Sequence, residues 1–258
     1  DSVNVTTGSA SATISETTGK TVTVNASSMT DTNLLTISGA GDFTVTGLVA
    51  DLSSTAAGGA VNVTTGDVAT QTLALGSGIT GTRTVNATAM TDGDALTLTG
   101  AGSLTLSTDD ADVLASAYTG SITATVTGTA AASYAMGTAS SSIASSNTGG
   151  LAVDATAMAD GQTLTLSGTG NQTVTHLLAD LTSTSTGTVI ATLDDNLGAG
   201  AVNTTITNNA GSGSLTVNTG DFTTGDTITL AGSREITVVG TDSVNVTTGS
   251  ASATISET

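Results

Sequence analysis

Residues 1–17 have the sequence DSVNVTTGSASATISET, and the same seventeen residues recur without a difference at 242–258. The chain therefore contains a long repeat with a period of 241 residues. Self-similarity at a fixed period is a signature of solenoids and other repeat architectures. We expect residues 1–241 to form one tandem unit and residues 242–258 to begin the next identical unit.

A shorter repeat lies inside the long one. It begins with VTVNASSMTD at Val22, RTVNATAMTD at Arg83, LAVDATAMAD at Leu151 and LTVNTGDFTTGD at Leu215. Aligned on the valine before Asn or Asp, the copies are 61, 68 and 64 residues apart, and a further step of 48 completes the period of 241. The expected sub-units are therefore about 22–82, 83–150, 151–214 and 215–241, the last continuing into the next copy.

Apolar residues alternate with polar ones in segments such as TVTVN (21–25), FTVTG (43–47) and LTLSG (164–168). This is the period of a β-strand, and Gly, Asn, Asp and Ser punctuate the segments as turns require. Strand centres are expected near residues 24, 45, 63, 85, 105 and 126. A meandering sandwich could show the same strand density, but it would not need nested periods. The sequence predicts an all-β fold, a β-solenoid (β-helix) of roughly 20-residue coils, stacked into a rod.

The composition agrees with a thin core between stacked strands. There is no Pro, no Cys and no Trp, and aromatic residues make up 2% of the chain. Pro cannot donate to a β ladder, so a chain in which nearly every strand has two neighbours excludes it. Disorder does not fit, because the chain is rich in β-branched residues. The missing Cys excludes a disulfide framework and a Cys-based metal site.

Charge and hydropathy limit the classes of partner that the chain can have. Twenty-one acidic residues face three basic ones, for a net charge of −18, which excludes a nucleic-acid-binding face. No run of about 20 apolar residues occurs, so no membrane span is expected.

No enzyme is expected from the reactive side chains. His176 is the single His, and no Cys accompanies it, so a Cys–His pair or a zinc site cannot be built. A polysaccharide lyase or hydrolase on a β-helix is the poorest fit, because such a groove needs carboxylates with Arg, Lys or Tyr. We expect no catalytic residues and no cofactor-binding residues.

The motifs LTISGAG (35–41), VTVNA (22–26) and VNVTTGD (61–67) resemble those of the very large bacterial tandem β-strand-repeat surface proteins. That group includes repetitive adhesins, S-layer-like proteins and sheath or filament proteins. The resemblance implies a structural protein at the cell surface or outside the cell, forming a filament, sheath, stalk or surface layer. It also implies self-association, end to end or laterally. The alternative is an adhesin that contacts carbohydrate or another surface, with surface glycans as further candidate partners.

Aspartates recur at fixed distances from the repeat anchors. They stand seven residues on at Asp31, Asp92 and Asp160, and nine residues on at Asp94 and Asp226. Carboxylate oxygens suit Ca²⁺, so these five are candidate calcium ligands. The alternative is that they serve turn geometry and solubility. The Gly-Gly-x-Gly-x-Asp repeat of calcium-binding β-rolls is absent, and the anchors lie several coils apart.

Two further expectations concern threonine rows and inserts. Thr-x-Thr rows on a solenoid face can bind ice, but here the rows do not recur once per coil in strict register along the sequence. The segments 48–54, 110–118 and 135–146 interrupt the alternation and are expected to be loops or single helical turns.

Overall fold

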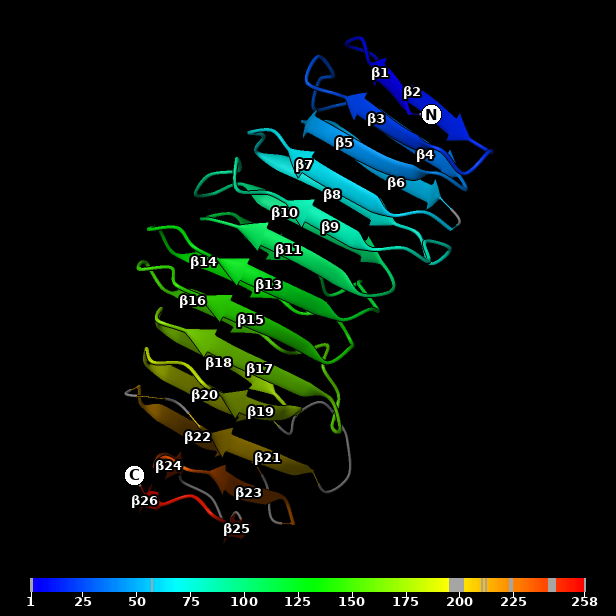
Figure 1. The fold of residues 1–258 in the computed structure, drawn as a ribbon. Helices are drawn as coiled ribbons and strands as arrows, with labels where there is room; N and C mark the ends of the chain where they lie inside the picture. Colours follow the sequence, from blue (N-terminus) through cyan, green and yellow to red (C-terminus); the bar gives the residue numbers. More distant parts are fainter. Residues whose placement is uncertain are drawn as a thin grey trace. The chain divides into compact units, whose positions relative to one another are not determined.

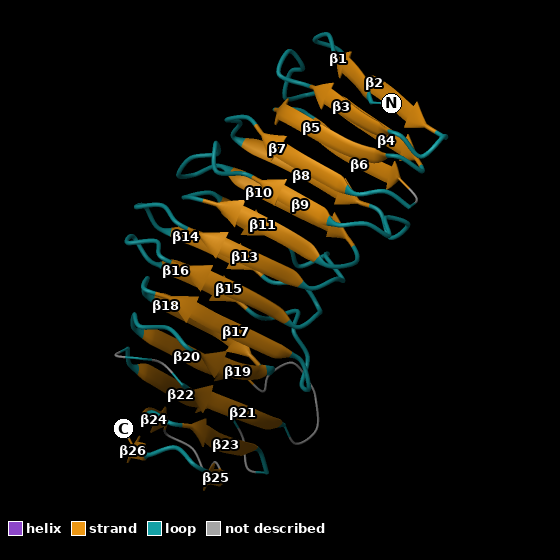
Figure 2. Ribbon diagram, in the orientation of Figure 1, coloured by secondary structure: helices purple, strands orange, loops and turns teal. Residues whose placement is uncertain are grey.

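The computed structural model describes residues 2–56, 58–194, 202–209, 211, 213–222, 225–240 and 245–257. The chain divides into two compact units, Asp1–Thr125 and Val126–Thr258, and each is described by itself. Within the described ranges every regular element is a strand and none is a helix (Figure 2). The all-β prediction is confirmed.

In the first unit the strands form two parallel sheets. One has the order β1 (Val3–Thr6), β3 (Thr21–Asn25), β5 (Asp42–Leu48), β7 (Val61–Thr65), β9 (Arg83–Asn86) and β11 (Leu104–Thr108). The other has the order β2 (Ala12–Glu16), β4 (Leu34–Gly39), β6 (Asp51–Ala56), β8 (Thr70–Leu75), β10 (Ala95–Gly100) and β12 (Asp112–Leu114).

The second unit repeats this plan, and β13 (Ile122–Val126) crosses the division between the units. One sheet has the order β15 (Ser141–Ser145), β17 (Thr163–Gly168), β19 (Asp180–Ser183), β21 (Asn203–Asn208), β23 (Thr227–Gly232) and β25 (Asn245–Thr248). The other has the order β14 (Ala132–Ala135), β16 (Leu151–Asp154), β18 (Gln172–Leu177), β20 (Val189–Asp194), β22 (Leu215–Asp221), β24 (Ile236–Gly240) and β26 (Ala253–Glu257).

Within each unit, consecutive strands therefore belong to opposite sheets, and each strand pairs in parallel with the next strand of its own sheet (Figure 1). A coil consists of two strands and two turns and contains roughly 21 residues, which makes each unit a β-solenoid, as predicted. The strand centres predicted near residues 24, 45, 63, 85 and 105 all fall in one sheet of the first unit. The strands of the other sheet lie between them along the chain.

Inward-facing side chains stack in columns between the two sheets. Val24 pairs in register with Val45, which pairs with Val63, and all three are at most 2% exposed. The four aromatic residues of the chain are also buried: Phe43, Tyr118, Tyr134 and Phe222. A narrow interior of small and medium side chains accounts for the low aromatic content.

A glycine ends one strand in each inner repeat and lets two coils approach closely. Gly39, Gly100, Gly168 and Gly232 have φ between +98° and +123°. A Cβ on any of them would lie 1.8–2.3 Å from a backbone oxygen of the neighbouring coil. Only glycine tolerates both the left-handed conformation and this contact. This explains the recurring motif of LTISGAG and its copies.

The Val-Asn/Asp anchors of the first three copies are turn-forming corners, whereas Val217 and Asn218 lie inside β22. The Oδ1 atoms of Asn25, Asn86 and Asp154 each accept hydrogen bonds from the N–H and the hydroxyl of the residue two places on, at 2.5–3.1 Å. A turn then follows, in which the buried Met29, Met90 or Met158 donates its N–H to the carbonyl three residues before it. Such local side-chain bonds replace strand pairing at a corner.

The inner repeat changes sheets along the chain. The anchor valines lie on odd-numbered strands in the first two copies (Val24 in β3, Val85 in β9) and on even-numbered strands in the last two (Val153 in β16, Val217 in β22). From one anchor valine to the next, the chain therefore advances by six, seven and six strands. The odd step of seven shifts the repeat by half a coil, so the same sequence unit can occupy either strand position of a coil.

The expectation of loops or helical turns in the three inserts was wrong in part, because each insert contributes a strand beside its turn residues. Residues 48–54 begin β6, residues 110–118 contain β12, and residues 135–146 contain β15. In β15 the inward positions are held by Ser141, Ile143 and Ser145, all buried. Buried serines hide the alternation that a hydropathy pattern detects.

Candidate functional site: acidic turns, a polar sheet face and the end coils

The five candidate calcium ligands are spread over four connecting segments. Asp31 and Asp160 are exposed in the turns that follow β3 and β16. Asp92 and Asp94 share the turn after β9, three coils from Asp31. At about 4.8 Å per coil, three coils separate Asp31 and Asp92 by about 14 Å, too far to share one ion.

Two of these carboxylates organise backbone. Asp94 Oδ2 accepts hydrogen bonds from the N–H of Thr91 at 2.6 Å and from its hydroxyl at 3.1 Å. Asp226, 1% exposed, accepts one from the N–H of Val202 at 2.9 Å. Within the described ranges no group of three or more His, Cys, Asp or Glu side chains is arranged to hold a metal ion. Calcium binding at these residues stays a prediction. Turn geometry explains Asp94, and a hydrogen bond to the neighbouring coil gives Asp226 a structural role.

His176 lies at a bulge in β18. Its φ of +54° is left-handed, and Gly47, at the equivalent bulge in β5, has φ +64°. His176 Nδ1 is 3.0 Å from Asp154 Oδ1, and both side chains are about half exposed. Partial burial raises the pKa of Asp154, but hydrogen bonds from Thr156 and His176 outweigh it and hold the pKa below its usual value. The pair links two neighbouring coils. The hydroxyl of Thr156 donates to the carboxylate of Asp154, whereas the nucleophile of a catalytic triad bonds to the imidazole.

Arg83 is a buried base that sequence reasoning treated only as one of three positive charges. It occupies an inward position between Val61 and Leu104 and is 6% exposed. Its Nη2 donates to the carbonyls of Gly76 at 3.3 Å and Ile79 at 2.6 Å, while its Nε has no hydrogen-bond partner among the described residues. The signal was available: Arg83 stands where the other copies have Val22 and Leu151.

Tyr118 closes the same part of the core. Its hydroxyl donates to the carbonyls of Ala101 at 3.2 Å and Gly102 at 2.9 Å. Burial raises the pKa of Tyr118, and the nearby Arg83 partly offsets this. The guanidinium and phenol therefore satisfy carbonyls of turns at the end of the core, and we assign them a structural role.

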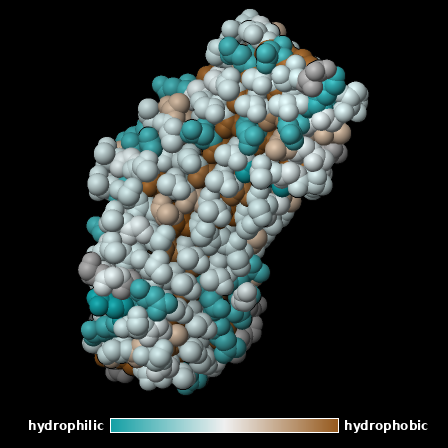
Figure 3. Space-filling model, in the orientation of Figure 1, coloured by the Kyte–Doolittle hydropathy of each residue, from teal (hydrophilic) through white to brown (hydrophobic). Residues whose placement is uncertain are grey.

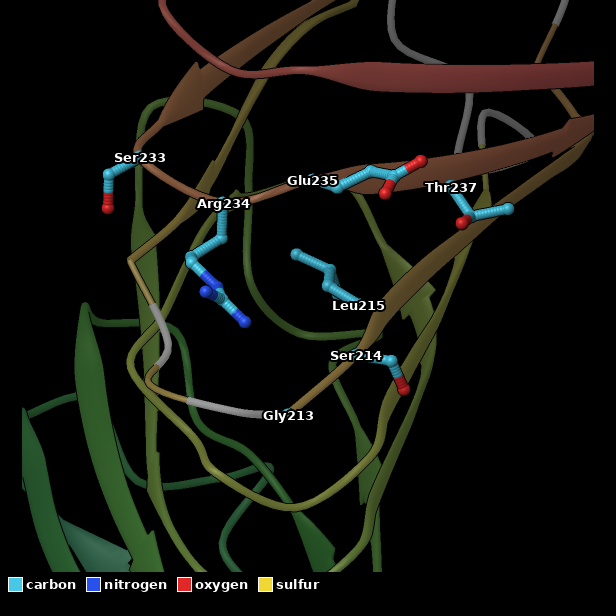
Figure 4. A pocket seen from close by; sticks show the side chains of 7 residues that line it. All are labelled: Gly213, Ser214, Leu215, Ser233, Arg234, Glu235 and Thr237. Atoms are coloured by element: carbon cyan, nitrogen blue, oxygen red, sulfur yellow. The ribbon is translucent and has the colours of Figure 1, made fainter.

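A surface hollow of about 370 Å³ lies between β22 and β24 (Figure 4). Arg234 points into it beside Leu215, whereas the carboxylate of Glu235 points away from Arg234. Glu235 Oε1 instead accepts a hydrogen bond from Thr254 at 2.5 Å. One exposed cation without a converging second polar group gives this hollow little capacity to orient a ligand.

A regular polar face covers the outside of one sheet in the first unit. Its outward positions form two columns of six residues along β1, β3, β5, β7, β9 and β11. The first column is in register throughout, and the second is interrupted by the register shift between β5 and β7. The columns are Asn4, Thr23, Thr44, Asn62, Thr84 and Thr105, and Thr6, Asn25, Thr46, Thr64, Asn86 and Ser107. None is charged and none is buried. Threonine does not recur once per coil in strict register on this face, as predicted, because Asn or Ser stands at several positions of both columns.

The molecular surface in view consists mainly of residues of intermediate hydropathy, with hydrophilic residues scattered among them (Figure 3). This agrees with strands whose outward positions are Thr, Ser and Asn and with acids placed in turns.

The two end coils form the same strands from the same sequence. β1 covers residues 3–6 and β25 covers 245–248, the equivalents of 4–7. At the offset of 241 residues, β2 (12–16) and β26 (253–257) coincide. Each end coil is exposed: Val3 is 45% and Ile255 is 55% accessible. Inward valines and isoleucines of the next coil, such as Val22 and Ile37, are at most 2% exposed.

The carboxylate of Glu16 organises the turn that connects the first coil to the second. Its carboxylate accepts hydrogen bonds from the hydroxyl and N–H of Thr18 and from the N–H groups of Gly19 at 2.7 Å and Lys20 at 3.0 Å. The Thr18 hydroxyl bond has the largest effect on the pKa of Glu16, burial opposes it, and the backbone bonds add to it, so the pKa lies below its usual value.

Comparison with known proteins adds no relative: no family model, curated protein or solved structure matches the chain. In the part of the chain that the structure describes, no helix is long and apolar enough to cross a membrane. The fold alone is thus the basis for assigning a function.

Proposed function

We propose that this chain is a structural segment of an extracellular, cell-surface assembly, a tandem-repeat β-solenoid that serves as a rod, filament, stalk or layer. One observation carries the proposal: the two copies of the seventeen-residue sequence form corresponding pairs of strands, 24 strands apart. A solenoid whose coil recurs after a whole number of coils can be extended by adding units without changing its plan. Self-association end to end follows from the same feature.

The composition supports this role. A net charge of −18 keeps an extended surface soluble. The inner repeats preserve corners and close-packing glycines, which build coils, rather than a constellation of reactive side chains.

Electron microscopy of the purified native assembly tests the proposal. We expect filaments or ordered layers with an axial period on the order of 58 Å, because twelve coils rise about 4.8 Å each. Isolated globular particles without any axial period would contradict it.

The second candidate is an adhesin, and the uncharged Thr/Asn face of the first unit favours it. Two columns of hydroxyl and amide groups could contact an extended polar surface such as a polysaccharide. All four aromatic side chains are buried, so binding could not use aromatic stacking on sugar rings.

Binding to insoluble polysaccharides tests the adhesin candidate. The variant Thr44→Arg places a long cation in the middle of the face, and Thr36→Arg in β4 is the matched change on the other sheet. Loss of binding in the first alone supports an adhesin. No binding by the unsubstituted chain rejects the candidate for the polysaccharides tested.

A further inference from the structure

Triplets of the form Asn-x-Ser/Thr recur along the chain. This triplet is the acceptor signature of N-linked glycosylation in proteins outside the cell, where a used acceptor lies in a surface loop. The sequence contains it seven times, at Asn4, Asn25, Asn62, Asn86, Asn171, Asn203 and Asn245. The triplet alone does not choose among these asparagines, so the choice depends on where the structure places each one.

Two of the seven asparagines lie at exposed corners of the first unit. Asn25 Oδ1 accepts hydrogen bonds from the N–H of Ser27 at 3.1 Å and from its hydroxyl at 2.8 Å. Asn86 Oδ1 accepts the same two bonds from Thr88 at the same distances. Both asparagines are exposed, and the Nδ2 atom of each has no hydrogen-bond partner among the described residues. The atom that would receive a sugar is therefore available at both corners.

The other triplets lack this arrangement. Asn62 lies in the middle of β7, in register with Thr44 of β5 and Thr84 of β9, so its backbone is paired on both sides. A transferase has to bind the acceptor backbone in a site of its own, which a segment paired on both sides cannot enter. Strands also contain three more of the asparagines, Asn4, Asn203 and Asn245.

Asn171 differs in the use of its side chain. Its Oδ1 accepts the N–H of Thr188, in the next coil, at 3.0 Å, and Thr173, the third residue of its triplet, lies within β18. Ser27 and Thr88, by contrast, are exposed turn residues outside the strands. Only the two corners thus combine an unpartnered Nδ2, a hydroxyl on the same amide and a turn that follows.

Building on the extracellular role proposed above, we propose that Asn25 and Asn86 are N-glycosylation sites. The donor class is an oligosaccharide joined to a polyisoprenyl lipid through a diphosphate. Nδ2 forms a bond to carbon C1 of the first sugar while the bond from C1 to the diphosphate oxygen breaks. The diphosphate leaves with the bonding electron pair, and Nδ2 loses one proton. The two corners are three coils apart, about 14 Å at about 4.8 Å per coil, which leaves room for a glycan at each.

The third copy of the inner repeat provides a matched negative control. Asp154 Oδ1 accepts the same pair of hydrogen bonds from Thr156, at 3.0 Å and 2.5 Å. A carboxylate has no N–H to exchange for a sugar, so this corner has the geometry without the acceptor. Asp154→Asn completes an Asn-Ala-Thr triplet there.

Peptide mapping by mass spectrometry of the protein purified from its natural source tests the proposal. We expect the peptides that contain Asn25 and Asn86 to carry glycan mass, and enzymatic release of N-glycans to leave Asp at both positions. The peptide that contains Asn62 should have its unmodified mass before and after release. Unmodified Asn25 and Asn86 overturn the proposal. Equal modification of Asn62 also overturns it, because the corner would then not select the acceptor.

Variants expressed in the same source test the corner itself. Ser27→Ala and Thr88→Ala should each abolish the glycan at their own corner and leave the other, with an unchanged β signal in far-UV circular dichroism. Asp154→Asn should gain a glycan at residue 154, and the same change combined with Thr156→Ala should not. An Asp154→Asn variant that stays unmodified overturns the role of the corner.

The two proposals fail independently. A native assembly that shows the axial period but carries no glycan keeps the structural role and rejects this inference. Glycans at both corners of a protein that forms no periodic assembly would do the reverse.

Discussion

Single glycines decide how closely two coils stack. Gly100 has φ +123°, and a Cβ there would lie 1.8 Å from the carbonyl oxygen of Leu75. Gly93 has φ +86° but no atom within 4 Å of such a Cβ. The two positions separate the conformational role of glycine from its close-packing role.

We expect Gly100→Ala to destabilise the chain by about 3 kcal/mol, because displacing the Leu75 backbone adds about 1–3 kcal/mol to about 1 kcal/mol for a left-handed alanine. Gly93→Ala should cost only about 1 kcal/mol. Urea unfolding followed by circular dichroism measures both. Equal costs would show that the neighbouring coil can shift away.

The hydrogen bonds of Glu16 predict that the stability of the fold depends on pH in the acidic range. Its pKa is lower in the folded chain than the ordinary 4.5, so its contribution is present above that value and is lost as the pH falls through the folded pKa. Glu16→Gln should lower the melting temperature at pH 7 and flatten its fall below pH 4.5. Melting curves from pH 7 to pH 2.5 check this, with Glu235→Gln as the control. Parallel curves for Glu16→Gln and the unsubstituted chain would contradict it.

At the level of the element, the corner rather than the strand distinguishes the inner repeats. Asn25, Asn86 and Asp154 make the same pair of hydrogen bonds in three copies. The alternation of strands was predictable from sequence, because inward Val and Leu recur at every second residue. The strand β15 was harder to predict, because buried Ser141 and Ser145 resemble outward residues.

Asn86 tests the corner. Asn86→Ala removes two hydrogen bonds at an exposed turn and should cost about 1 kcal/mol. Asn86→Asp should cost little, because Asp154 performs the same role in the third copy. The difference between the two variants in urea midpoint is the measurement. A larger loss in Asn86→Asp than in Asn86→Ala would indicate charge repulsion rather than turn geometry.

The candidate calcium ligands show what sequence spacing could not decide. Asp31 and Asp92 recur at the same distance from their anchors, but the repeat spans three coils, so recurrence places them apart instead of together. Arg83 was missed as a core residue because its chemistry suggests the surface, although its place in the repeat is that of Val22 and Leu151. Position within the repeat was the better guide to burial.

Chelation distinguishes calcium binding from turn formation at the scale of the whole molecule. We expect melting curves with and without chelator to coincide at matched ionic strength, because the described carboxylates do not converge. Ionic strength must match because salt alone relieves repulsion in a chain of charge −18. A melting temperature lowered by chelator and restored by Ca²⁺ would instead support the calcium sites.

At the scale of the whole molecule, the solenoid is extended one coil at a time. The sequence that follows an end coil therefore determines whether another coil can stack on it. A chain of residues 1–258 followed directly by residues 18–258 places coil 18–39 next to β25 and β26, in the register that β1 and β2 already use. Because stability in a solenoid is the sum of nearest-neighbour interfaces, residues 245–257 gain a second interface there.

Amide hydrogen exchange at residues 245–257 measures that gain. We expect protection in the fused chain to rise from the level of an end coil to that of interior strands such as β23. The control fuses residues 1–258 to residues 1–258, a difference of seventeen residues that sets two identical coils in succession. At that junction, the outer side of coil 242–258 fits strands β3 and β4, whereas the outer side of the following coil, residues 1–17, fits strands β23 and β24. The two sides that meet do not match, so the protection of residues 245–257 should remain low. Equal protection in the two fusions would mean that coils stack without regard to sequence, and the 241-residue period would then have no structural cause.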